Sequence, residues 1–441
     1  MTADVPCLKG ISWTGLPSHG QAITVLLTKT NIERAGMSFT VAKRRAVMGG
    51  GLAAITGIGG KTGRAAGSGP IRIGVLNDQS GAYASLTGPG SVTAARMAIE
   101  DAGGSILGRP VELLVADHQN KADVGAMIAR EWADQANVGL LIDIGHSAVA
   151  LAVQDIVRDK NRIAIYTSVG TTRITEESCT SNGFSWCYDA YALANGLTAA
   201  LSQRGLKTWF LAVTDYAFGR SLEEEMRAAV GRTGGSVVGA VRHPEHASDF
   251  SSYILQAIAA KPQILGLLNS GEDMVNSLKQ ALEFGFPGQI AAPLVFITDV
   301  HAVGLSSAQG LTFVTAFYWD RTDDTRRFGQ RFFAVQNAMP SMAQAAVYSG
   351  VSHYLKSVAA AGTTVNNAVL AKMRALPVND FYADNGWLRA DGRLMHDLYL
   401  VQVKSPSASK RPWDYYDVLA TVSAEQAFRK PSESRCPLLR T

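Results

Sequence analysis

The sequence contains few cysteines and little charge, and both shortages exclude classes of function. Only four of the 441 residues are cysteines: Cys7, Cys179, Cys187 and Cys436. They form no CxxC pair and no cluster with histidine, so we expect no metal site. Charged residues make up 18% of the chain and the net charge is +4, without a Lys/Arg stripe interleaved with aromatic residues. We therefore expect no nucleic-acid partner.

The signature motifs of several enzyme classes are also missing. We find no HExxH motif, no GxSxG motif and no intact dinucleotide-binding fingerprint. His243 and His246 have a spacing that suggests a metal site, but they precede the start of a helix and no third ligand is evident. This context favours solvated loop histidines. The sequence thus predicts a protein that is not an enzyme and has no cofactor.

Cysteine spacing leaves the disulfide pattern open. Cys179 and Cys187 lie close together in the loop-like stretch CTSNGFSWC. In an exported protein they could form a disulfide that closes a short loop. They could equally be two unpaired cysteines, one of them buried, since spacing alone does not fix connectivity.

The N-terminal region has the order of a signal peptide. Residues 37–67 begin with the basic patch Lys43–Arg45, continue with an uncharged run to Gly60 and end in small residues. The adjacent arginines resemble a twin-arginine signal, but Ala46 and Val47 depart from its pattern, so the Tat and Sec routes both stay open. No cysteine follows for a lipid anchor. We expect residues 1–36 to be an untranslated or disordered extension, and the protein to be periplasmic.

The body of the chain alternates apolar runs with amphipathic helix patterns. We predict a long helix over about 343–361, a strand or strand pair over 397–404, and two series of strands. The predicted strands are 71–76, 111–116, 139–144 and 162–166, then 207–213, 236–241, 263–268, 294–297 and 311–317. Such βα alternation predicts an α/β fold with two doubly wound parallel sheets. No low-complexity linker divides the chain, which favours two lobes that exchange segments.

Ligands of open parallel sheets bind at the carboxyl ends of the strands. The loops at these predicted ends are rich in hydroxyl groups and glycine, and several of them open a helix. Free N–H groups at helix starts bind carboxylates well, although Ser, Asp and Asn are also ordinary helix caps. The candidate residues in these loops are Ser80, Tyr83, His146, Ser147, Ala148, Ser168, Asp215, Phe218, Gly271, Asp273 and Asp299.

Four segments together resemble binding proteins of the leucine/isoleucine/valine-binding type, which serve ABC importers. The segments are IRIGVLNDQSGAYASLTGPGSVTAARMAIEDAGG, ILGRPVELLVADHQNKADVGAMIAREW, TDYAFGRSLEEEM and ITDVHAVGLSSAQGLTFVTAFYWD. The resemblance covers about 71–422 and implies a type I periplasmic binding protein, with two lobes joined by a three-segment hinge. Lobe 1 would comprise 70–190 and 318–375, and lobe 2 would comprise 191–317 and 376–425. A tail, 426–441, would follow.

The resemblance also assigns roles to the candidate residues. It implies that the loops Ser80–Tyr83 and His146–Ala148 bind a ligand carboxylate, and that Tyr188 and Asp189 lie near the first chain crossing. Phe218 falls at an aromatic position of the second lobe, and Gly271–Asp273 falls where amino-acid binders place an acid for the ligand ammonium.

The chain departs from the amino-acid binders at the predicted crevice. His146 stands in a stretch that is usually rich in Ser and Thr, where it could pair with a carboxylate or pack in the hinge. Aromatic residues are also plentiful there, which is similar to the branch that binds aromatic acids. These residues, some of which could be ordinary core, are Tyr83, Tyr188, Tyr191, Phe218, Tyr318 and Trp319.

The predicted function has one alternative. We expect a small organic acid or amino acid as the ligand, with a branched-chain amino acid, an amide and an aromatic carboxylate all left open, and delivery to an ABC permease and ATPase complex in the inner membrane. The alternative is a ligand-sensing receptor domain of the same fold, which neighbouring genes would distinguish.

Overall fold

The computed structural model describes residues 69–440. The predicted signal peptide at 37–67 and the predicted extension at 1–36 lie outside the described residues. Within 69–440, no helix is both long enough and apolar enough to span a membrane.

The first sheet has six strands in the order β2-β3-β1-β4-β5-β6. All neighbouring pairs are parallel except the short hairpin between β2 and β3. The strands are β1 Ile71–Asn77, β2 Ser105–Ile106, β3 Arg109–Asp117, β4 Val138–Asp143, β5 Ile163–Tyr166 and β6 Gly183–Ser185.

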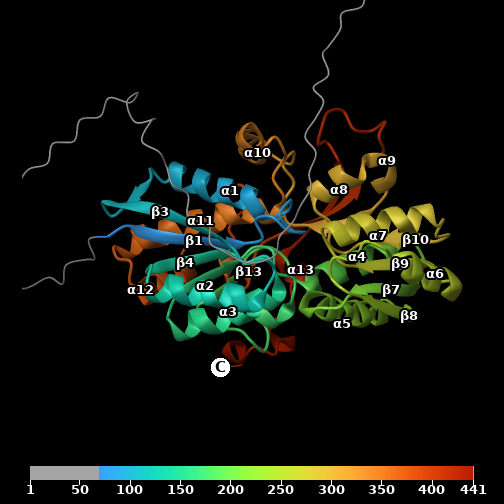
Figure 1. The fold of residues 1–441 in the computed structure, drawn as a ribbon, viewed down its shortest axis with the longest axis horizontal. Helices are drawn as coiled ribbons and strands as arrows, with labels where there is room; N and C mark the ends of the chain where they lie inside the picture. The colour runs from blue at the N-terminus through green and yellow to red at the C-terminus, as the bar shows by residue number, and fades with distance from the viewer. Residues whose placement is uncertain (1–68, 441) are drawn as a thin grey trace, which may run out of the picture. The chain divides into compact units, whose positions relative to one another are not determined.

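Helices cover both faces of this sheet, as expected of parallel strands that are apolar on both sides. Figure 1 shows α1 and α11 on one face and α2 and α3 on the other. Ile73 and Val75 belong to the hydrophobic core on one side of β1, whereas Leu76 belongs to the second core. The covering helices are α1 Gly88–Asp101, α2 Ala122–Asp134, α3 Ser147–Asp159, α10 Asp323–Gln336, α11 Met342–Ala361 and α12 Asn366–Ala375. We call this group of elements lobe 1.

The second sheet is fully parallel, with the order β10-β9-β7-β8. Its strands are β7 Thr208–Thr214, β8 Ser236–His243, β9 Ile264–Leu268 and β10 Gln289–Ala291. Its helices are α4 Ala190–Ser202, α5 Ala217–Arg232, α6 Ser251–Ala260, α7 Glu272–Glu283, α8 Ile297–Val303 and α9 Leu305–Ala308. The predicted strand 294–297 is wrong: the strand comes earlier, at β10, and Ile297 begins α8.

A third sheet joins segments that are far apart in the sequence. β11 (Thr312–Thr315), β14 (Leu398–Val403) and β15 (Tyr416–Val422) pair antiparallel, and β11 contacts α4. The run 311–317 therefore does not continue the parallel series, although it was predicted to do so. β12 (Trp387–Leu388) and β13 (Leu394–Met395) form a separate hairpin. We call the second and third sheets with their helices lobe 2; the predicted residue boundaries of both lobes stay a prediction.

Three chain segments connect the lobes, after β6, after β11 and after α12. Two of them are held together by a buried ion pair, in which Arg393 Nη2 lies 2.8 Å from Asp189 Oδ2. His396, also buried, lies 3.0 Å from the carbonyl oxygen of Cys187. These contacts fix the path of the chain where it passes between the lobes.

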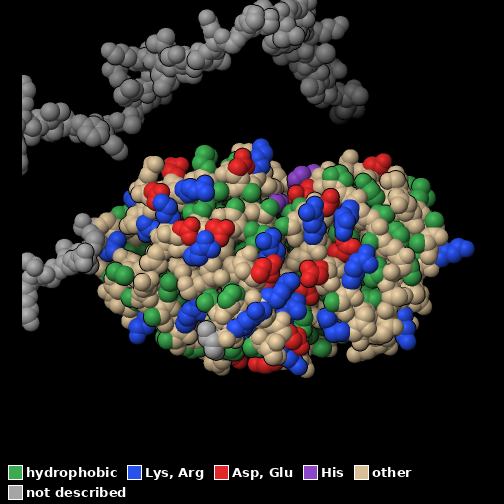
Figure 2. All heavy atoms as spheres, turned by 90° about the horizontal axis from the view of Figure 1, so that it is seen from below, with side chains coloured by type: hydrophobic (Ala, Val, Ile, Leu, Met, Phe, Trp, Pro, Cys, Tyr) green, Lys and Arg blue, Asp and Glu red, His purple; other side chains and the backbone are tan. Residues whose placement is uncertain are grey.

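The C-terminal segment 424–440 lies against both lobes instead of forming a tail. It contains α13 (Ala424–Ala427) and two short 3-10 turns, η2 (Pro431–Glu433) and η3 (Pro437–Leu439). Arg429 forms ion pairs with Glu176 of lobe 1 and Glu225 of lobe 2, both buried. Figure 2 shows acidic and basic side chains gathered in the middle of the face that carries this segment.

The disulfide joins Cys179 to Cys436, with a Cα–Cα distance of 5.8 Å. The predicted alternative of a Cys179–Cys187 bond is therefore wrong. Cys187 is free and buried in the hinge, where burial raises its pKa to about 12. Nothing near Cys179 in the sequence indicated a partner 257 residues away.

Candidate functional site

A small, largely enclosed cavity of about 10 Å³ lies where the carboxyl ends of strands from both lobes face each other. This free space holds about one water molecule, far less than the roughly 300–1,000 Å³ of drug-sized ligand pockets, so a ligand can enter only when the lobes move further apart. Among residues 69–440, no charged side chain lines it. The lining residues are Tyr83, Leu86, Gly145, Ser147, Ser168, Gly170, Tyr188, Tyr216, Phe218, Ser270, Leu294 and Phe296.

Lobe 1 supplies the polar side of the cavity. Ser147 is the first residue of α3, and the preceding His146 makes no capping hydrogen bond with its side chain. The first N–H groups of an α-helix have no partner within the helix and carry partial positive charge. The Ser168 hydroxyl also lines the cavity and donates to Asp143 Oδ1 at 3.0 Å. On this side the N–H groups at the start of α3 are donors from which an anionic oxygen can accept, whereas the single O–H of Ser168 is used by Asp143.

Aromatic rings form the apolar walls. Tyr188 of the first hinge segment packs edge-on against Phe296, with ring centroids 6.1 Å apart. Tyr216 and Phe218 lie at the start of α5 with centroids 6.0 Å apart. Each of these rings buries a large apolar area, so the walls favour a flat or bulky apolar ligand body.

Glycine positions let the two lobes approach closely. A Cβ atom placed on Gly170 of lobe 1 would lie 2.4 Å from Phe218 Cδ2 of lobe 2. Gly271, at the start of α7, has φ +59°, and a Cβ there would lie 2.9 Å from the Ala82 carbonyl oxygen. The structure is therefore a closed form, in which contacts from both lobes surround the cavity.

Polar contacts cross between the lobes beside the cavity. Tyr83 Oη lies 3.2 Å from Tyr216 Oη and donates to Glu245 Oε1 at 3.4 Å. His146 Nε2 lies 3.1 Å from the same carboxylate oxygen. The His146 ring also stacks on Tyr216, with centroids 4.7 Å apart.

Five of the residues predicted from the sequence line the cavity: Tyr83, Ser147, Ser168, Tyr188 and Phe218. His146, Ala148 and Gly271 adjoin lining residues in the chain without lining the cavity themselves. Ser80 is exposed, donates to Asp117 and lines a separate open hollow. Ligand binding by any of these residues stays a prediction.

Two predicted acidic residues make contacts of their own away from the cavity lining. Asp189 caps α4 by accepting from the Ala192 N–H at 2.9 Å, and it pairs with Arg393 in the hinge. Asp215 is exposed and pairs with Arg220 of the same lobe. Neither carboxylate lines the cavity.

Asp273 and Asp299 are buried behind the cavity lining. Asp273 accepts from the His246 N–H at 3.1 Å, and burial raises its pKa to about 6. Asp299 accepts from the N–H of Phe296 at 2.9 Å, and burial raises its pKa to about 7. Asp299 thus supports a lining residue from behind, and Asp273 supports the loop that carries Glu245.

The sequence interpretation missed several residues at the site. Tyr216 and Ser270 lie in the loops that were singled out, but nothing in the sequence distinguished them from their neighbours. Leu294 and Phe296 were missed because their apolar run was interpreted as strand. His243 was expected to be a solvated histidine, but it is fully buried beside Asn269 and Phe250; His246 is exposed. Between them, Glu245 was not considered.

Of the aromatic residues predicted near the crevice, Tyr318 and Trp319 pack elsewhere. Tyr318 donates to Asp414 at 3.3 Å, and Trp319 donates to the Trp413 carbonyl oxygen at 2.8 Å. Tyr191 lies beneath the guanidinium groups of Arg232 and Arg429. None of the three lines the cavity.

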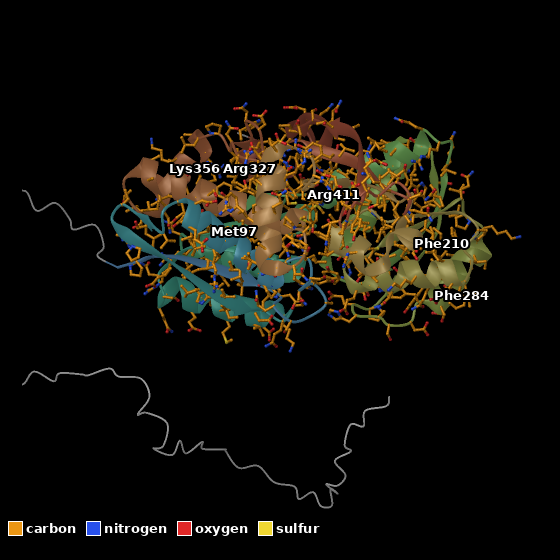
Figure 3. The ribbon with its side chains drawn as sticks, turned by 90° about the horizontal axis from the view of Figure 1, so that it is seen from above. Met97, Phe210, Phe284, Arg327, Lys356 and Arg411 are labelled. Carbon is orange, nitrogen blue, oxygen red and sulfur yellow. A yellow bond between two sulfur atoms is a disulfide. The ribbon has the colours of Figure 1, made fainter. Side chains whose placement is uncertain are left out.

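A larger open groove of about 520 Å³ lies on lobe 1 between α1, α10 and α11. Figure 3 shows two of its residues, Arg327 of α10 and Lys356 of α11, near each other. This groove has a mixed charged rim and does not lie at the strand ends. Among residues 69–440, no cluster of three or more His, Cys, Asp or Glu side chains could hold a metal ion.

Two α/β lobes with an enclosed cavity at facing strand ends define a two-lobed ligand-binding protein. A sequence profile of the family described as periplasmic binding protein matches residues 70–410. The chain belongs to this family, so the predicted family and the predicted type I fold are confirmed.

Two solved structures from Burkholderia share substantial sequence identity with the chain. A periplasmic binding protein from Burkholderia mallei is 46% identical with a TM-score of 0.83; the match covers 84% of this chain and 100% of that one. A branched-chain amino acid ABC transporter periplasmic ligand-binding protein from Burkholderia xenovorans LB400 is 40% identical with a TM-score of 0.76, with the same coverage.

A more distant solved structure shares the fold. It is an ABC transporter solute-binding protein from R. palustris in complex with benzoate, 20% identical, with a TM-score of 0.74 and coverage of 84% and 100%. No curated protein sequence matches the chain.

Proposed function

We propose that this protein is the substrate-binding component of an ABC importer and that its ligand is a small carboxylate with an aromatic or similarly apolar body. The observation that carries this proposal is the closed cavity, whose lining combines five aromatic rings with three serines and, among residues 69–440, no charged side chain. The protein is exported to the periplasm, performs no catalysis and delivers its ligand to an inner-membrane permease and ATPase complex. Its lobes comprise 70–190 with 318–375, and 191–317 with 376–425.

The uncharged lining favours a ligand without an ammonium group. Burying an ammonium ion without a carboxylate partner is costly. Asp273, in the segment where amino-acid binders place an acid, is not a lining residue and already accepts from the His246 N–H. An α-amino acid would therefore leave its ammonium group without a partner in this cavity.

The start of α3 favours a carboxylate at the lobe 1 side. Its first N–H groups and the Ser147 hydroxyl are donors that need no counter-charge to bind an anion, whereas the Ser168 hydroxyl already donates to Asp143. Aromatic walls from the hinge and lobe 2 would then cover the ligand body, at about 25 cal/mol per Å² of apolar surface buried.

Closure gives the mechanism of capture. Groups from both lobes surround the cavity, so a ligand contacts all of them only when the lobes are closed. Binding then shifts the population from open to closed forms. The closed form is the one that a permease would recognise.

A thermal-shift screen with matched ligand pairs tests the proposal. The protein from residue 69 onward, refolded to remove any carried ligand, is mixed with benzoate or benzamide, 3-phenylpropanoate or phenylalanine, and 4-methylpentanoate or leucine. We expect the carboxylate without an amine to stabilise the protein in each pair. A ligand at 100 times its Kd adds about 2.7 kcal/mol.

Two serine variants test where the carboxylate binds. Ser147→Ala removes a lining hydroxyl and should weaken binding of the best carboxylate about tenfold, the value of a hydrogen bond to a charged group. Ser252→Ala changes an exposed serine of α6 and should leave the affinity unchanged. Stabilisation by leucine and phenylalanine but not by their deaminated partners would reject the proposed ligand class. If no compound of the screen raised the melting temperature, the proposed function would be rejected.

A further inference from the structure

Glu245 of lobe 2 makes polar contacts with two side chains of lobe 1 through one carboxylate oxygen. Its Oε1 atom lies 3.1 Å from His146 Nε2 and accepts a hydrogen bond from Tyr83 Oη at 3.4 Å. Tyr83 also meets Tyr216 of lobe 2 at 3.2 Å. We name these four residues, Tyr83, His146, Tyr216 and Glu245, the clasp.

The clasp residues are partly shielded from water, and this shielding strengthens the contacts between them. The side chain of His146 is 3% exposed and that of Glu245 is 25% exposed. Contacts of charged groups in such an environment are stronger than those of surface ion pairs, which contribute little. Two clasp residues, Tyr83 and Tyr216, also line the cavity.

We propose that Glu245 is a positioning residue for ligand capture, because it holds Tyr83 and His146 of the opposite lobe in their closed positions. This inference rests on the proposed function only for its consequence in ligand binding. Glu245 does not line the cavity, so it acts through the two side chains that it contacts. His146 in turn precedes Ser147, the first residue of α3, so the clasp fixes the helix start at which the carboxylate would bind.

The clasp contacts involve protein groups alone, so they stabilise the closed form whether or not a ligand is present. They raise the fraction of closed protein without ligand, and they slow the opening step that releases a bound ligand. Loss of Glu245 therefore lowers the closed fraction of the free protein and accelerates release, whereas loss of a residue that only touches ligand leaves that fraction unchanged.

The test uses Glu245→Ala and the near-isosteric Glu245→Gln, with Glu283→Ala as the matched control. Glu283 is an exposed acid at the end of α7 in the same lobe. Small-angle X-ray scattering of the ligand-free proteins should show a larger radius of gyration for Glu245→Ala. Stopped-flow release of the carboxylate found in the screen should be about tenfold faster, with a smaller change for Glu245→Gln and none for Glu283→Ala.

A double-mutant cycle separates the clasp from a general structural role. If Glu245 acts through Tyr83, the effect of Glu245→Gln on the radius of gyration and on release should shrink in a Tyr83→Phe background. Circular dichroism and the melting temperature confirm that each variant is folded. An unchanged radius of gyration in both Glu245 variants would overturn the inference. Because scattering needs no ligand, this outcome is distinct from failure of the proposed function.

Discussion

At the scale of single residues, two positions without a side chain set how closely the lobes approach. Gly271 adopts a left-handed backbone, φ +59°, which disfavours any side chain on conformational grounds alone. Gly170 is different, because its φ does not lie in the left-handed region and only space excludes a methyl group: the added Cβ would lie 2.4 Å from the ring of Phe218. Gly170 therefore allows a clean test of closure.

Gly170→Ala should weaken ligand binding at least tenfold, because the methyl group meets Phe218 before the lobes are fully closed. The free open form carries no such clash, so the melting temperature without ligand should change little. Isothermal titration calorimetry with the best carboxylate measures the affinity, and circular dichroism measures the melting temperature.

The matched control is Gly231→Ala in α5, where an added Cβ would meet no atom within 4 Å. This change should leave affinity unchanged and add up to about 1 kcal/mol of stability, because alanine favours helix over glycine. Equal affinities of Gly170→Ala and the unsubstituted protein would mean that ligand binds without the closed geometry seen here.

Residue-level prediction from the sequence succeeded where position alone defines the role. Tyr83, Ser147 and Phe218 follow strand ends, and strand ends in parallel sheets face the ligand crevice. Asp189 and Asp215 follow the same rule but make a cap and an ion pair instead, and a sequence pattern cannot separate these uses of a carboxylate. Glu245 follows a strand too, yet its importance comes from contacts with the other lobe, which are invisible until the lobes are placed.

At the scale of elements, hydrophobic periodicity predicted most helices and strands because each element has one dominant environment. The predicted long helix at 343–361 is α11, which is almost wholly buried, and strand 71–76 lies within β1. The failure at 294–297 has a physical reason. Leu294 and Phe296 line the cavity and Ile297 begins α8, and apolar residues that are buried without sheet pairing have the same sequence pattern as a buried strand.

The C-terminal segment 424–440 is the element whose role the sequence least indicated. It is tied to lobe 1 by the Cys179–Cys436 disulfide and joined to both lobes by Arg429. The disulfide links residues separated by 257 positions. Cross-links of this kind stabilise mainly by restricting the unfolded chain, by typically 2–4 kcal/mol.

Cys436→Ser should therefore lower the free energy of unfolding by about 2–4 kcal/mol, as measured by urea denaturation without reductant. Reducing the unsubstituted protein with dithiothreitol should reproduce the effect. Cys187→Ala, which changes the free hinge cysteine, should not remove the sensitivity to reductant. If reductant left both proteins unchanged, the segment would be held by its ion pairs and packing alone.

At the scale of the whole molecule, buried titratable groups make stability depend on pH in two opposing ways. Burial raises the pKa of Asp273 to about 6 and that of Asp299 to about 7, so the folded protein holds these protons more tightly than the unfolded chain does. Their stabilising effect is complete below about pH 4 and is lost as pH rises through 6 and 7. His118 and His396, whose pKa burial lowers to about 4, add stability as pH rises from about 4 to 6.5.

Asp299→Asn should remove one of these pH dependences. Relative to the unsubstituted protein, the free energy of unfolding of the variant should rise by on the order of 2–3 kcal/mol between pH 5 and pH 7 and then level off. Urea denaturation at a series of pH values measures this difference. Asp384→Asn, at an exposed position, serves as control. If the difference in free energy of unfolding between Asp299→Asn and the unsubstituted protein did not change with pH, the Asp299 carboxyl would titrate in the folded protein as it does in the unfolded chain.

Because the chain passes back and forth between the lobes, it also determines the order in which the parts of each lobe are synthesised and can fold. β1 emerges early from the ribosome, whereas α11, which covers one face of its sheet, is synthesised after all of the parallel strands of lobe 2. The disulfide of Cys179 also cannot form until Cys436 has been synthesised. At a synthesis rate of about 5–20 residues per second, each of these delays lasts on the order of tens of seconds. Throughout the first delay the face of the first sheet that α11 covers is covered only in part, by α1 (Figure 1), so the unfinished chain exposes apolar surface of the kind that chaperones bind.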